Sequence, residues 1–294
     1  MLEHPVVVIG AGPAGLSAAI QLIRQGISPL VLERNQIGGL LNNACWVENY
    51  PGFVEGISGP DLVTLFQRQA DRLGITVSKE EVLSVDYEDK LFRIGTNKGQ
   101  FRAEFLVAAT GTKARTLPQD LFFGNFEGKV YTDVYPLLGE KGSTVVVTGA
   151  GDAALDYALN LAKHNQVVIL NRGSQIKGLS LLWDRIQKNS SIKYFPEMGI
   201  TKVIREEDGR ISIMAGTGAT QNQIECDYLV TAIGRVPELG FAGGKFIKHM
   251  DQLQEEKKLF LIGDLQNGSF RQTALAVGDG IRSGMEIGQI LEKG

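Results

Sequence analysis

Cysteine and histidine are scarce in this chain, and neither is arranged as a site. The 294 residues include two cysteines and three histidines. Cys45 and Cys226 form no C-x-x-C pair, which excludes a disulfide framework and suits a reducing compartment. The histidines, at positions 4, 164 and 249, have no metal-ligand spacing, so no metal site is expected.

Long apolar runs and an excess of one charge are also missing. No hydrophobic stretch approaches the ~18–20 residues that span a bilayer, and the N-terminus carries no basic signal-peptide region. The formal net charge is −3 at pH 7, which is unlike the basic surface of a nucleic-acid-binding protein. These absences predict a soluble, cytoplasmic protein that binds neither membranes nor nucleic acids.

Glycine, by contrast, is abundant, and it marks two copies of one pattern. The chain contains 36 glycines. Residues 5–9 read PVVVI, an apolar run typical of a buried parallel strand, and a G-x-G-x-x-G turn and a helix-like segment follow. Residues 144–148 read TVVVT and precede a G-x-G-x-x-A turn and a second helix-like segment. The turns start at Gly10 and Gly149, a separation that indicates two related nucleotide-binding domains.

The repeated pattern of strand, glycine turn and helix predicts the fold class. We expect an α/β protein with two Rossmann-type domains of the three-layer ββα kind, the second inserted in the first. The first, discontinuous domain is placed at residues 1–116 and 245–294, and the inserted domain at residues 117–244. A chain of 294 residues suits two domains, since a domain averages ~100–200 residues.

The first glycine turn predicts a dinucleotide site. In such a turn the first glycine permits a tight bend, the second lets the backbone approach a pyrophosphate, and the third lets helix and strand pack closely. The helix N-terminus behind the turn attracts phosphate through its free N–H groups. Glu33 ends the next predicted strand, where its carboxylate can accept hydrogen bonds from ribose hydroxyls. The motif alone leaves the choice between FAD and NAD open.

Several further segments resemble the thioredoxin reductase family. Residues 37–41 read IGGLL, residues 47–53 read VENYPGF and residues 59–62 read GPDL, where that family reads GGQL, VENYPGF and GPEL. Near the C-terminus, residues 262–264 read IGD and residues 271–280 read RQTALAVGDG, similar to the family's flavin-binding terminal motif. The likeness covers nearly the whole chain in the same order, and it implies that the first domain binds FAD.

The predicted FAD site combines the first glycine turn with these segments. The resemblance implies that Asn49, Arg271 and Gln272 contact the flavin or its ribityl-phosphate chain, and that Asp264 bonds a ribityl hydroxyl. The full predicted set is Gly10, Gly12, Pro13, Ala14, Gly15, Glu33, Arg34, Gly38, Gly39, Leu40, Asn49, Val82, Thr110, Gly111, Gly263, Asp264, Arg271, Gln272 and Thr273.

The second glycine turn predicts a pyridine-nucleotide site. Its alanine variant is permitted because alanine is still small enough for close packing. The strand that follows ends at Asn171, with no Asp or Glu to favour an unphosphorylated ribose. The resemblance implies a cationic grip on the 2′-phosphate of NADPH, of which Arg172 and Lys177 remain while Gly173 has lost a charge. NADPH is favoured over NADH, and a domain that binds no nucleotide stays an alternative. The predicted set is Gly149, Gly151, Asp152, Ala153, Arg172 and Lys177.

The redox disulfide of the resembling family is missing. That family carries C-x-x-C in the second domain, and the matching residues 131–136 read YTDVYP here, with Thr132 and Tyr135 roughly where the cysteines would stand. Neither forms a disulfide, so electrons are not expected to leave through an internal dithiol. Asp133 is either a proton donor near the flavin or a structural residue. Cys45 is either a reactive thiol or a small residue that fills space.

The sequence therefore predicts a flavoenzyme and leaves its acceptor open. We expect an FAD-dependent oxidoreductase that takes hydride from NAD(P)H and passes electrons to a separate protein or small molecule. The alternatives are a flavoprotein without pyridine-nucleotide activity, a small-disulfide reductase that uses Cys45, and a ferredoxin or flavodoxin–NADP reductase. The resemblance implies a homodimer, and no catalytic residue is assigned.

Overall fold

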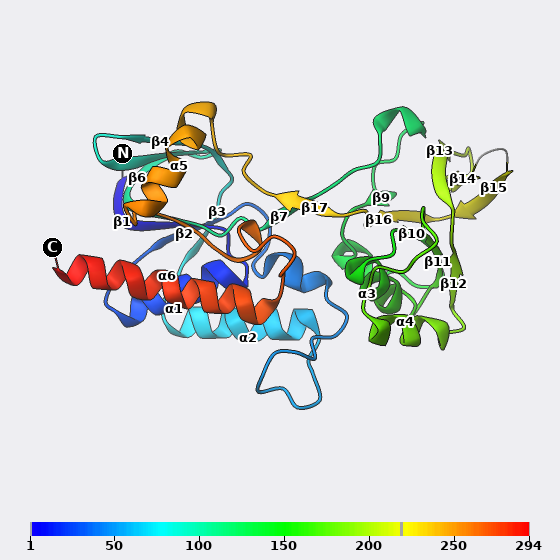
Figure 1. The fold of residues 1–294 in the computed structure, drawn as a ribbon, viewed down its shortest axis with the longest axis horizontal. Helices are drawn as coiled ribbons and strands as arrows, with labels where there is room; N and C mark the ends of the chain where they lie inside the picture. The colour runs from blue at the N-terminus through cyan, green and yellow to red at the C-terminus, as the bar shows by residue number, and fades with distance from the viewer. Residues whose placement is uncertain (1, 218–219, 294) are drawn as a thin grey trace. The chain divides into compact units, whose positions relative to one another are not determined.

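The computed structural model describes residues 2–217 and 220–293. The chain folds into two compact units. Unit 1 comprises Met1–Asn42, Val47–Lys113 and Pro237–Gly294, and unit 2 comprises Asn43–Trp46 and Ala114–Val236 (Figure 1). The long insertion begins at Ala114 and ends at Val236, whereas the sequence places it at residues 117–244. The assignment of four residues around Cys45 to unit 2 was not expected from the sequence.

Unit 1 is built around one mixed sheet of seven strands. Its strand order is β3-β2-β1-β6-β5-β4, and β18 also pairs with β6. β1, β2, β3, β6 and β18 run parallel, whereas β4 and β5 extend the sheet through antiparallel pairs. The strands are β1 (Leu2–Ile9), β2 (Leu30–Glu33), β3 (Val77–Lys79), β4 (Val82–Glu88), β5 (Leu91–Thr96), β6 (Gln100–Ala108) and β18 (Leu259–Leu261).

Strand β1 is central because it is apolar on both faces. Val6, Val7 and Val8 have no exposed surface. Val8 stands between Val31 of β2 and Val107 of β6 in the parallel register. A continuous apolar run is what a parallel strand covered on both sides requires, so the strand predicted at residues 5–9 is confirmed.

Helices cover both faces of this sheet. Helices α1, α2 and α6 lie on one side and α5 lies on the other (Figure 1), and each side has its own buried apolar cluster. The helices are α1 (Pro13–Arg24), α2 (Gly59–Arg72), α5 (Gly244–Glu255) and α6 (Thr273–Lys293), with short 3-10 helices η1 (Gly39–Asn43) and η4 (Gly263–Leu265). Unit 1 therefore has three layers, but both of its outer layers are helical, whereas the predicted ββα order has a second sheet as one outer layer.

Helices α1 and α6 approach closely because α6 presents a row of glycines. Gly280, Gly284 and Gly288 recur every four residues and therefore lie on one face of the helix. A Cβ on Gly280 would collide with the carbonyl oxygen of Ala14, and one on Gly284 would lie 2.9 Å from Cβ of Gln21. The row therefore packs α6 along α1, from Ala14 near the start of α1 to Gln25 at its C-cap.

Unit 2 repeats the layered plan with a second sheet in place of one helical layer. A five-stranded parallel sheet, β12-β11-β10-β16-β9, is covered on one face by α3 and α4, and a four-stranded sheet, β15-β14-β13-β8, packs on the other. The parallel strands are β9 (Val130–Tyr131), β10 (Thr144–Thr148), β11 (Gln166–Leu170), β12 (Ile192–Phe195) and β16 (Tyr228–Thr231). The other elements are β8 (Phe122–Phe123), β13 (Gly199–Arg205), β14 (Ile211–Thr217), β15 (Thr220–Cys226), α3 (Asp152–Leu161), α4 (Ser180–Gln187), η2 (Gln119–Leu121) and η3 (Tyr135–Leu137). Together the two units confirm the predicted fold class of two Rossmann-type domains.

Two short strands lie where the chain passes from one unit to the other. β7 (Thr112–Ala114) pairs with β17 (Arg235–Pro237) as a separate two-stranded sheet. The pairing is extended by the Arg115 N–H, which donates to the Gly234 carbonyl oxygen at 2.9 Å. The two segments in which the chain passes from one unit to the other are therefore hydrogen-bonded to each other.

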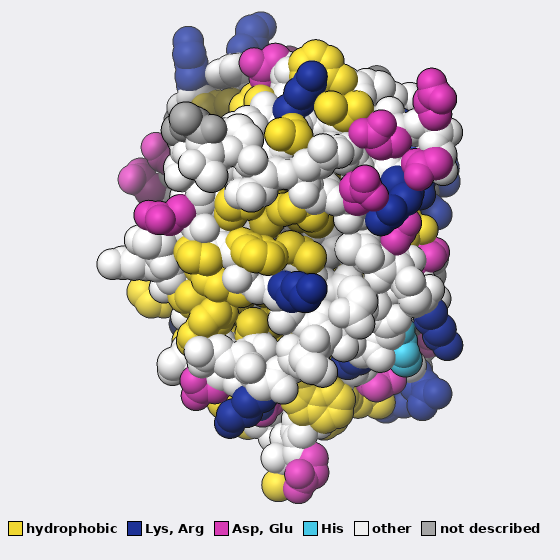
Figure 2. Space-filling view, turned by 90° about the vertical axis from the view of Figure 1, so that its right-hand side faces the viewer, with side chains coloured by type: hydrophobic (Ala, Val, Ile, Leu, Met, Phe, Trp, Pro, Cys, Tyr) yellow, Lys and Arg dark blue, Asp and Glu magenta, His cyan; other side chains and the backbone are white. Residues whose placement is uncertain are grey.

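The surface carries apolar side chains that the two cores do not absorb. In unit 2 the exposed large ones include Phe123, Leu179, Leu181 and Phe195. Figure 2, which views the right-hand side of Figure 1, shows apolar side chains gathered near the middle of that face. Exposed apolar side chains are normal on a folded protein.

Within the described part of the chain, no helix combines the length and the apolar composition needed to cross a membrane.

Candidate functional site

The glycine turn of unit 1 forms an open cradle at the N-terminus of α1. Gly10 has a φ of +100°, and a Cβ there would collide with the carbonyl oxygen of Ala109. A Cβ on Gly15 would collide with the carbonyl oxygen of Gly10. Gly12 is different, because a Cβ on it would meet nothing within 4 Å. Packing within the protein therefore requires glycine at the first and third positions, whereas the second position, Gly12, faces open space.

Glu33 is fixed beside this cradle. Its Oε2 accepts the N–H of Ala11 at 2.8 Å, and its Oε1 accepts the N–H of Asn35 at 2.8 Å. Each carboxylate oxygen has a second lone pair, so the group keeps acceptor capacity for a ribose hydroxyl. The structure therefore brings the predicted ribose-binding acid to the predicted phosphate-binding turn.

Glu238 contacts three of the predicted site residues, although the sequence analysis did not predict Glu238 itself. Arg34 forms an ion pair with the Glu238 carboxylate at 3.3 Å. The Thr110 hydroxyl donates to the Glu238 carbonyl oxygen at 2.7 Å, and the Glu238 N–H donates to the Gly111 carbonyl oxygen at 3.0 Å. No local pattern could identify this glutamate, because it lies 204 residues from Arg34 in the chain.

The glycine pair after β2 folds against the cradle. Gly38 has a φ of +93° and donates its N–H to the Ala11 carbonyl oxygen at 2.8 Å. Gly39 begins η1, and a Cβ on it would lie 3.7 Å from Cα of Gly12. Asn42, a buried residue that the sequence missed, donates to the Gly39 carbonyl oxygen at 3.1 Å and holds the turn of η1. Leu40 lies within the same short helix.

The C-terminal motif contacts the segment that contains Asn49. The Asn49 side-chain amide donates to Oε1 of Gln272 at 2.7 Å. Gly263 has a φ of +66° and donates its N–H to the Asp279 carboxylate at 3.2 Å, a partner that the sequence did not predict. Asp264 follows in η4, and Thr273 is the first residue of α6. Val82 begins β4 and packs against one of the buried clusters of unit 1.

The residues of this region fit the chemistry of FAD. Within the described structure, Nε of Arg271 is buried and has no hydrogen-bond partner, which is costly unless a ligand supplies an acceptor. The open side of Gly12 lies at a helix N-terminus, where N–H groups favour phosphate. A cation, free backbone amides and the Glu33 carboxylate are the donors and acceptors that a diphosphate and a ribose require.

The glycine turn of unit 2 has the same geometry. Gly149 has a φ of +133°, and a Cβ there would collide with the carbonyl oxygen of Ala232. Gly151 precedes α3 as Gly12 precedes α1, and a Cβ on it would also meet nothing within 4 Å. The second unit therefore carries a second open cradle, as the repeated motif predicts.

A second segment folds over this turn in unit 2 as Gly38 does in unit 1. The N–H groups of Lys177 and Gly178 donate to the Ala150 carbonyl oxygen at 2.9 and 3.0 Å. The Asp152 carboxylate accepts the N–H of Leu179 at 2.7 Å. Gly178 was not predicted, yet a Cβ on it would lie 2.6 Å from the Leu155 side chain. The predicted Asp152 thus fixes this segment of the chain.

The end of β11 is followed by the residues that the sequence predicts to bind a 2′-phosphate. The Asn171 side-chain amide donates to the Gln175 carbonyl oxygen and to the Tyr194 hydroxyl, each at 2.9 Å. Its Oδ1 accepts the Gly173 N–H at 3.0 Å, so this side chain is occupied by the protein. Arg172 and Lys177 follow β11 in the sequence, and both side chains are exposed. They supply positive charge after the end of this strand. Ala153 is exposed in the first turn of α3.

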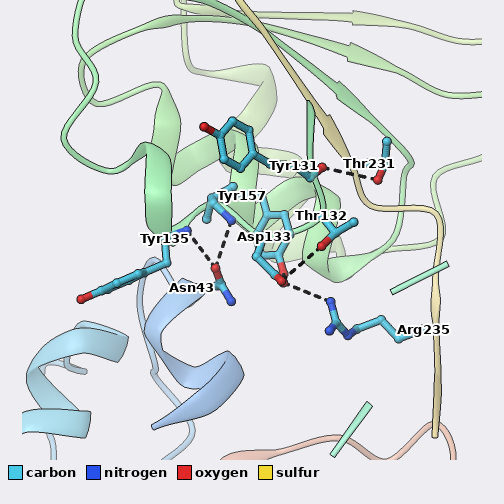
Figure 3. A network of polar contacts seen from close by, with 9 residues as sticks. Asn43, Tyr131, Thr132, Asp133, Tyr135, Tyr157, Thr231 and Arg235 are labelled. Atoms are coloured by element: carbon cyan, nitrogen blue, oxygen red, sulfur yellow. Dashed lines mark hydrogen bonds and ion pairs between the residues drawn. The ribbon is translucent and has the colours of Figure 1, made fainter. Parts of the chain in front are cut away.

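Where the resembling family has a disulfide, unit 2 has a network of polar side chains (Figure 3). The Asp133 carboxylate accepts from the Arg235 guanidinium at 3.1 Å, from the Tyr157 hydroxyl at 3.4 Å and from the Thr132 hydroxyl at 3.3 Å. Burial and the charge of Asp133 raise the pKa of Tyr157. Asp133 accepts all three bonds as a carboxylate, so the geometry favours its structural role over that of a proton donor.

Neither cysteine has the surroundings of a nucleophile. Burial, reinforced by the Asp156 carboxylate, raises the pKa of the Cys45 thiol, although Lys163 opposes the shift. Burial raises the pKa of Cys226 to about 12. A raised pKa leaves less of the reactive thiolate at neutral pH. In the ranges 2–217 and 220–293, no group of three His, Cys, Asp or Glu side chains could hold a metal ion.

Comparison with known proteins gives one consistent match. The model of a family described as pyridine nucleotide-disulphide oxidoreductase matches residues 4–280. A thioredoxin reductase of Rickettsia conorii is 30% identical, and the alignment covers 98% of each chain. An NADPH-dependent thioredoxin reductase of Arabidopsis thaliana is 31% identical over 94% of this chain and 56% of that protein.

Solved structures share the fold. The thioredoxin reductase of T. acidophilum superposes with a TM-score of 0.83 at 25% identity, covering 99% of both chains. A Lactococcus lactis thioredoxin reductase gives a TM-score of 0.84 at 24% identity, again covering 99% of both chains. A bacillithiol disulfide reductase of Bacillus cereus gives 0.74 at 20% identity, covering 98% of this chain and 99% of that one.

Proposed function

The chain belongs to the pyridine nucleotide-disulphide oxidoreductase family, and we propose that it is an FAD-dependent NAD(P)H oxidoreductase that passes electrons to a separate acceptor without an internal disulfide. The observation that carries this proposal is the pair of matching cradles at Gly12 and Gly151. Thr132 and Tyr135 at the disulfide position support the remainder, because neither side chain forms a disulfide. When bound, FAD supplies the redox chemistry: it takes up hydride from a reduced nicotinamide and gives up electrons to an acceptor.

The residues of unit 1 would bind and orient the cofactor. The N–H groups at the start of α1 would hold its diphosphate beside Gly12, and Glu33 would accept hydrogen bonds from its ribose. The half-buried Arg271 side chain would contribute a positive charge, and its buried Nε would donate a hydrogen bond. The contact between Asn49 and Gln272 would fix these two side chains on the cofactor.

The residues of unit 2 would bind the electron donor. The start of α3 offers the same N–H groups to a diphosphate beside Gly151. Arg172 and Lys177 would attract the 2′-phosphate of NADPH, and no acidic side chain ends β11 to favour NADH. NADPH is therefore the preferred donor in this proposal.

A homodimer also belongs to the proposal. The resemblance implies it, and α6 supports it with exposed apolar side chains at Leu275, Ile281 and Met285. The glycines of α6 that pack on α1 are other residues, at positions 280, 284 and 288. A second copy of the chain would cover the apolar side chains that remain in water.

Anaerobic reduction tests the donor directly. NADPH is expected to bleach the flavin band at ~450 nm of the FAD-loaded protein, and NADH to do so more weakly. Replacing Arg172 and Lys177 together by alanine is expected to raise the KM for NADPH while that for NADH changes little, because only NADPH carries the 2′-phosphate. A protein that binds FAD but is bleached by neither nucleotide would instead be a flavoprotein without pyridine-nucleotide activity.

Cys45→Ser tests the route of the electrons. NAD(P)H-dependent reduction of an artificial acceptor, and of ferredoxin, flavodoxin and small disulfides, is expected to proceed at the wild-type rate in this variant. The reason is that the raised pKa of the Cys45 thiol disfavours its use as a nucleophile. Cys45→Ala, assayed in parallel, separates loss of the thiol from introduction of a hydroxyl. Loss of turnover in both variants, with FAD retained, would establish the small-disulfide reductase that uses this thiol.

A further inference from the structure

A four-residue segment, Asn43–Trp46, is held by unit 2 although both its flanking segments belong to unit 1. Oδ1 of Asn43 accepts the N–H groups of Val134 and Tyr135 at 3.0 and 2.9 Å (Figure 3). The Cys45 N–H donates to the Asp156 carboxylate at 2.9 Å. The segment is therefore attached to unit 2 at two separate positions by hydrogen bonds that join residues far apart in the sequence.

Asn43 acts as a cap for a helix that lies elsewhere in the chain. Val134 and Tyr135 stand at the start of η3, where N–H groups have no acceptor within the helix itself. Val134 is fully buried and Asn43 is only 5% exposed, so water cannot easily replace the amide oxygen. Losing this acceptor would leave a buried N–H unsatisfied.

Helix α3 holds the other part of the segment. Asp156 and Asn160 are four residues apart and therefore face the same way. Asp156 accepts the Cys45 N–H, and the Asn160 side-chain amide donates to the Asn43 carbonyl oxygen at 3.4 Å. The same contacts keep the Cys45 thiol partly buried beside a carboxylate, which raises its pKa.

The segment capped by Asn43 is also the one in which Thr132 and Tyr135 replace the disulfide expected from the family. Its other attachment is Asp133, which is paired with Arg235 and Tyr157. The two sets of contacts differ in origin, since Asp133 is bonded within the long insertion whereas Asn43 comes from a segment 91 residues earlier. Release of Asn43 would free the backbone of residues 134–135 and leave the Asp133 ion pair in place.

We propose that residues 43–46 form a latch with a closed and an open state. In the closed state the latch caps η3 through Asn43 and shields Cys45. The latch opens as a local unit, without unfolding of unit 2. The latch is continuous with η1, which begins at Gly39 beside the first cradle and ends at Asn43. The proposal adds a conformational step to the proposed function and does not depend on it. Opening removes both the burial and the Asp156 charge that raise the pKa of the thiol, so it makes Cys45 more reactive.

Hydrogen exchange and thiol alkylation of the FAD-loaded protein test the latch together. In Asn43→Ala, amide exchange in peptides that cover residues 132–137 and 43–47 is expected to accelerate by on the order of tenfold, because the N–H groups of Val134 and Tyr135 lose their acceptor. Alkylation of Cys45 is expected to accelerate with it, while exchange in α3 and β10 stays at the wild-type rate. Asn43→Asp, which keeps an acceptor oxygen at the same reach, is expected to retain most of the protection.

The matched control is Asn165→Ala, which removes another buried asparagine of unit 2. Asn165 accepts the Ser143 N–H at 3.0 Å and donates to the carbonyl oxygens of Glu140 and Leu161, each at 3.0 Å, so its hydrogen bonds join other residues than those of the latch. Equal acceleration in both alanine variants, or none in Asn43→Ala, would overturn the proposal. If Asn43→Ala does not fold, Asp156→Ala takes its place: it removes the acceptor of the Cys45 N–H, and unchanged exchange at residues 43–47 would overturn the latch equally.

Discussion

Gly12→Ala is expected to give a folded protein that has lost most of its affinity for FAD. A Cβ at this position meets no protein atom within 4 Å, and Gly12 has a φ of −74° that alanine adopts freely. The methyl group instead occupies the space that a diphosphate needs in order to reach the N–H groups of α1. Each charge-assisted hydrogen bond lost is worth ~1.5–3 kcal/mol, which corresponds to about 10- to 150-fold in affinity.

Gly151→Ala is the matched variant in the second unit. Gly151 has a φ of −91° and the same open surroundings, so its replacement is expected to preserve the fold as well. FAD binding should remain at the wild-type level, whereas reduction by NADPH should require a concentration higher by a similar factor. The two variants together separate the cofactor site from the donor site.

Flavin absorbance after purification, circular dichroism and anaerobic reduction distinguish the possible results. Gly15→Ala serves as the structural control, because its methyl group would collide with the carbonyl oxygen of Gly10 and disrupt unit 1 itself. Gly12→Ala that retains FAD at wild-type affinity would refute the assignment of the first cradle. Gly151→Ala that is reduced normally by NADPH would refute the assignment of the second.

The glycine turns were predictable because every residue involved lies within a short stretch of sequence. A run of β-branched residues, two or three glycines at fixed spacing and a following helix determine the local backbone, and Glu33 stands at the end of the next strand. The same spacing recurs from residue 144 onward. Local rules therefore sufficed for both cradles and for the layered fold.

The partners that complete the sites were not predictable, because they are distant in the chain. Glu238 contacts Arg34 and Thr110, and Asp279 contacts Gly263, yet neither acid follows any pattern that marks it. The latch depends on Asn43, and no local sequence pattern marks this residue. Its role follows only from the fold, which brings the start of η3 beside it. Side chains that satisfy buried N–H groups are defined by tertiary structure and not by spacing.

Asp156→Asn is expected to stabilise unit 2 at neutral pH by up to about 3 kcal/mol. Burial raises the pKa of Asp156 from 3.8 to about 6, against the opposing effects of the Cys45 N–H and of Lys163 and Arg185. The folded protein thus binds the proton more tightly than the unfolded chain does. The contribution of Asp156 to the free energy of unfolding is therefore most favourable below pH 3.8. It falls between pH 3.8 and about 6 and stays reduced above that range. A shift of one unit corresponds to ~1.4 kcal/mol.

Asparagine imitates the protonated form at every pH and still offers an oxygen to the Cys45 N–H, so the latch is expected to remain closed. Denaturation followed by tryptophan fluorescence reports on unit 2 alone, because Trp46 and Trp183 both lie in it. The wild type should lose stability from pH 4 to pH 7 relative to the variant, whereas Glu207→Gln, an exposed carboxyl of the same unit, should follow the wild type. A variant less stable than the wild type at pH 8 would mean that the attraction of Lys163 and Arg185 for the carboxylate outweighs its burial.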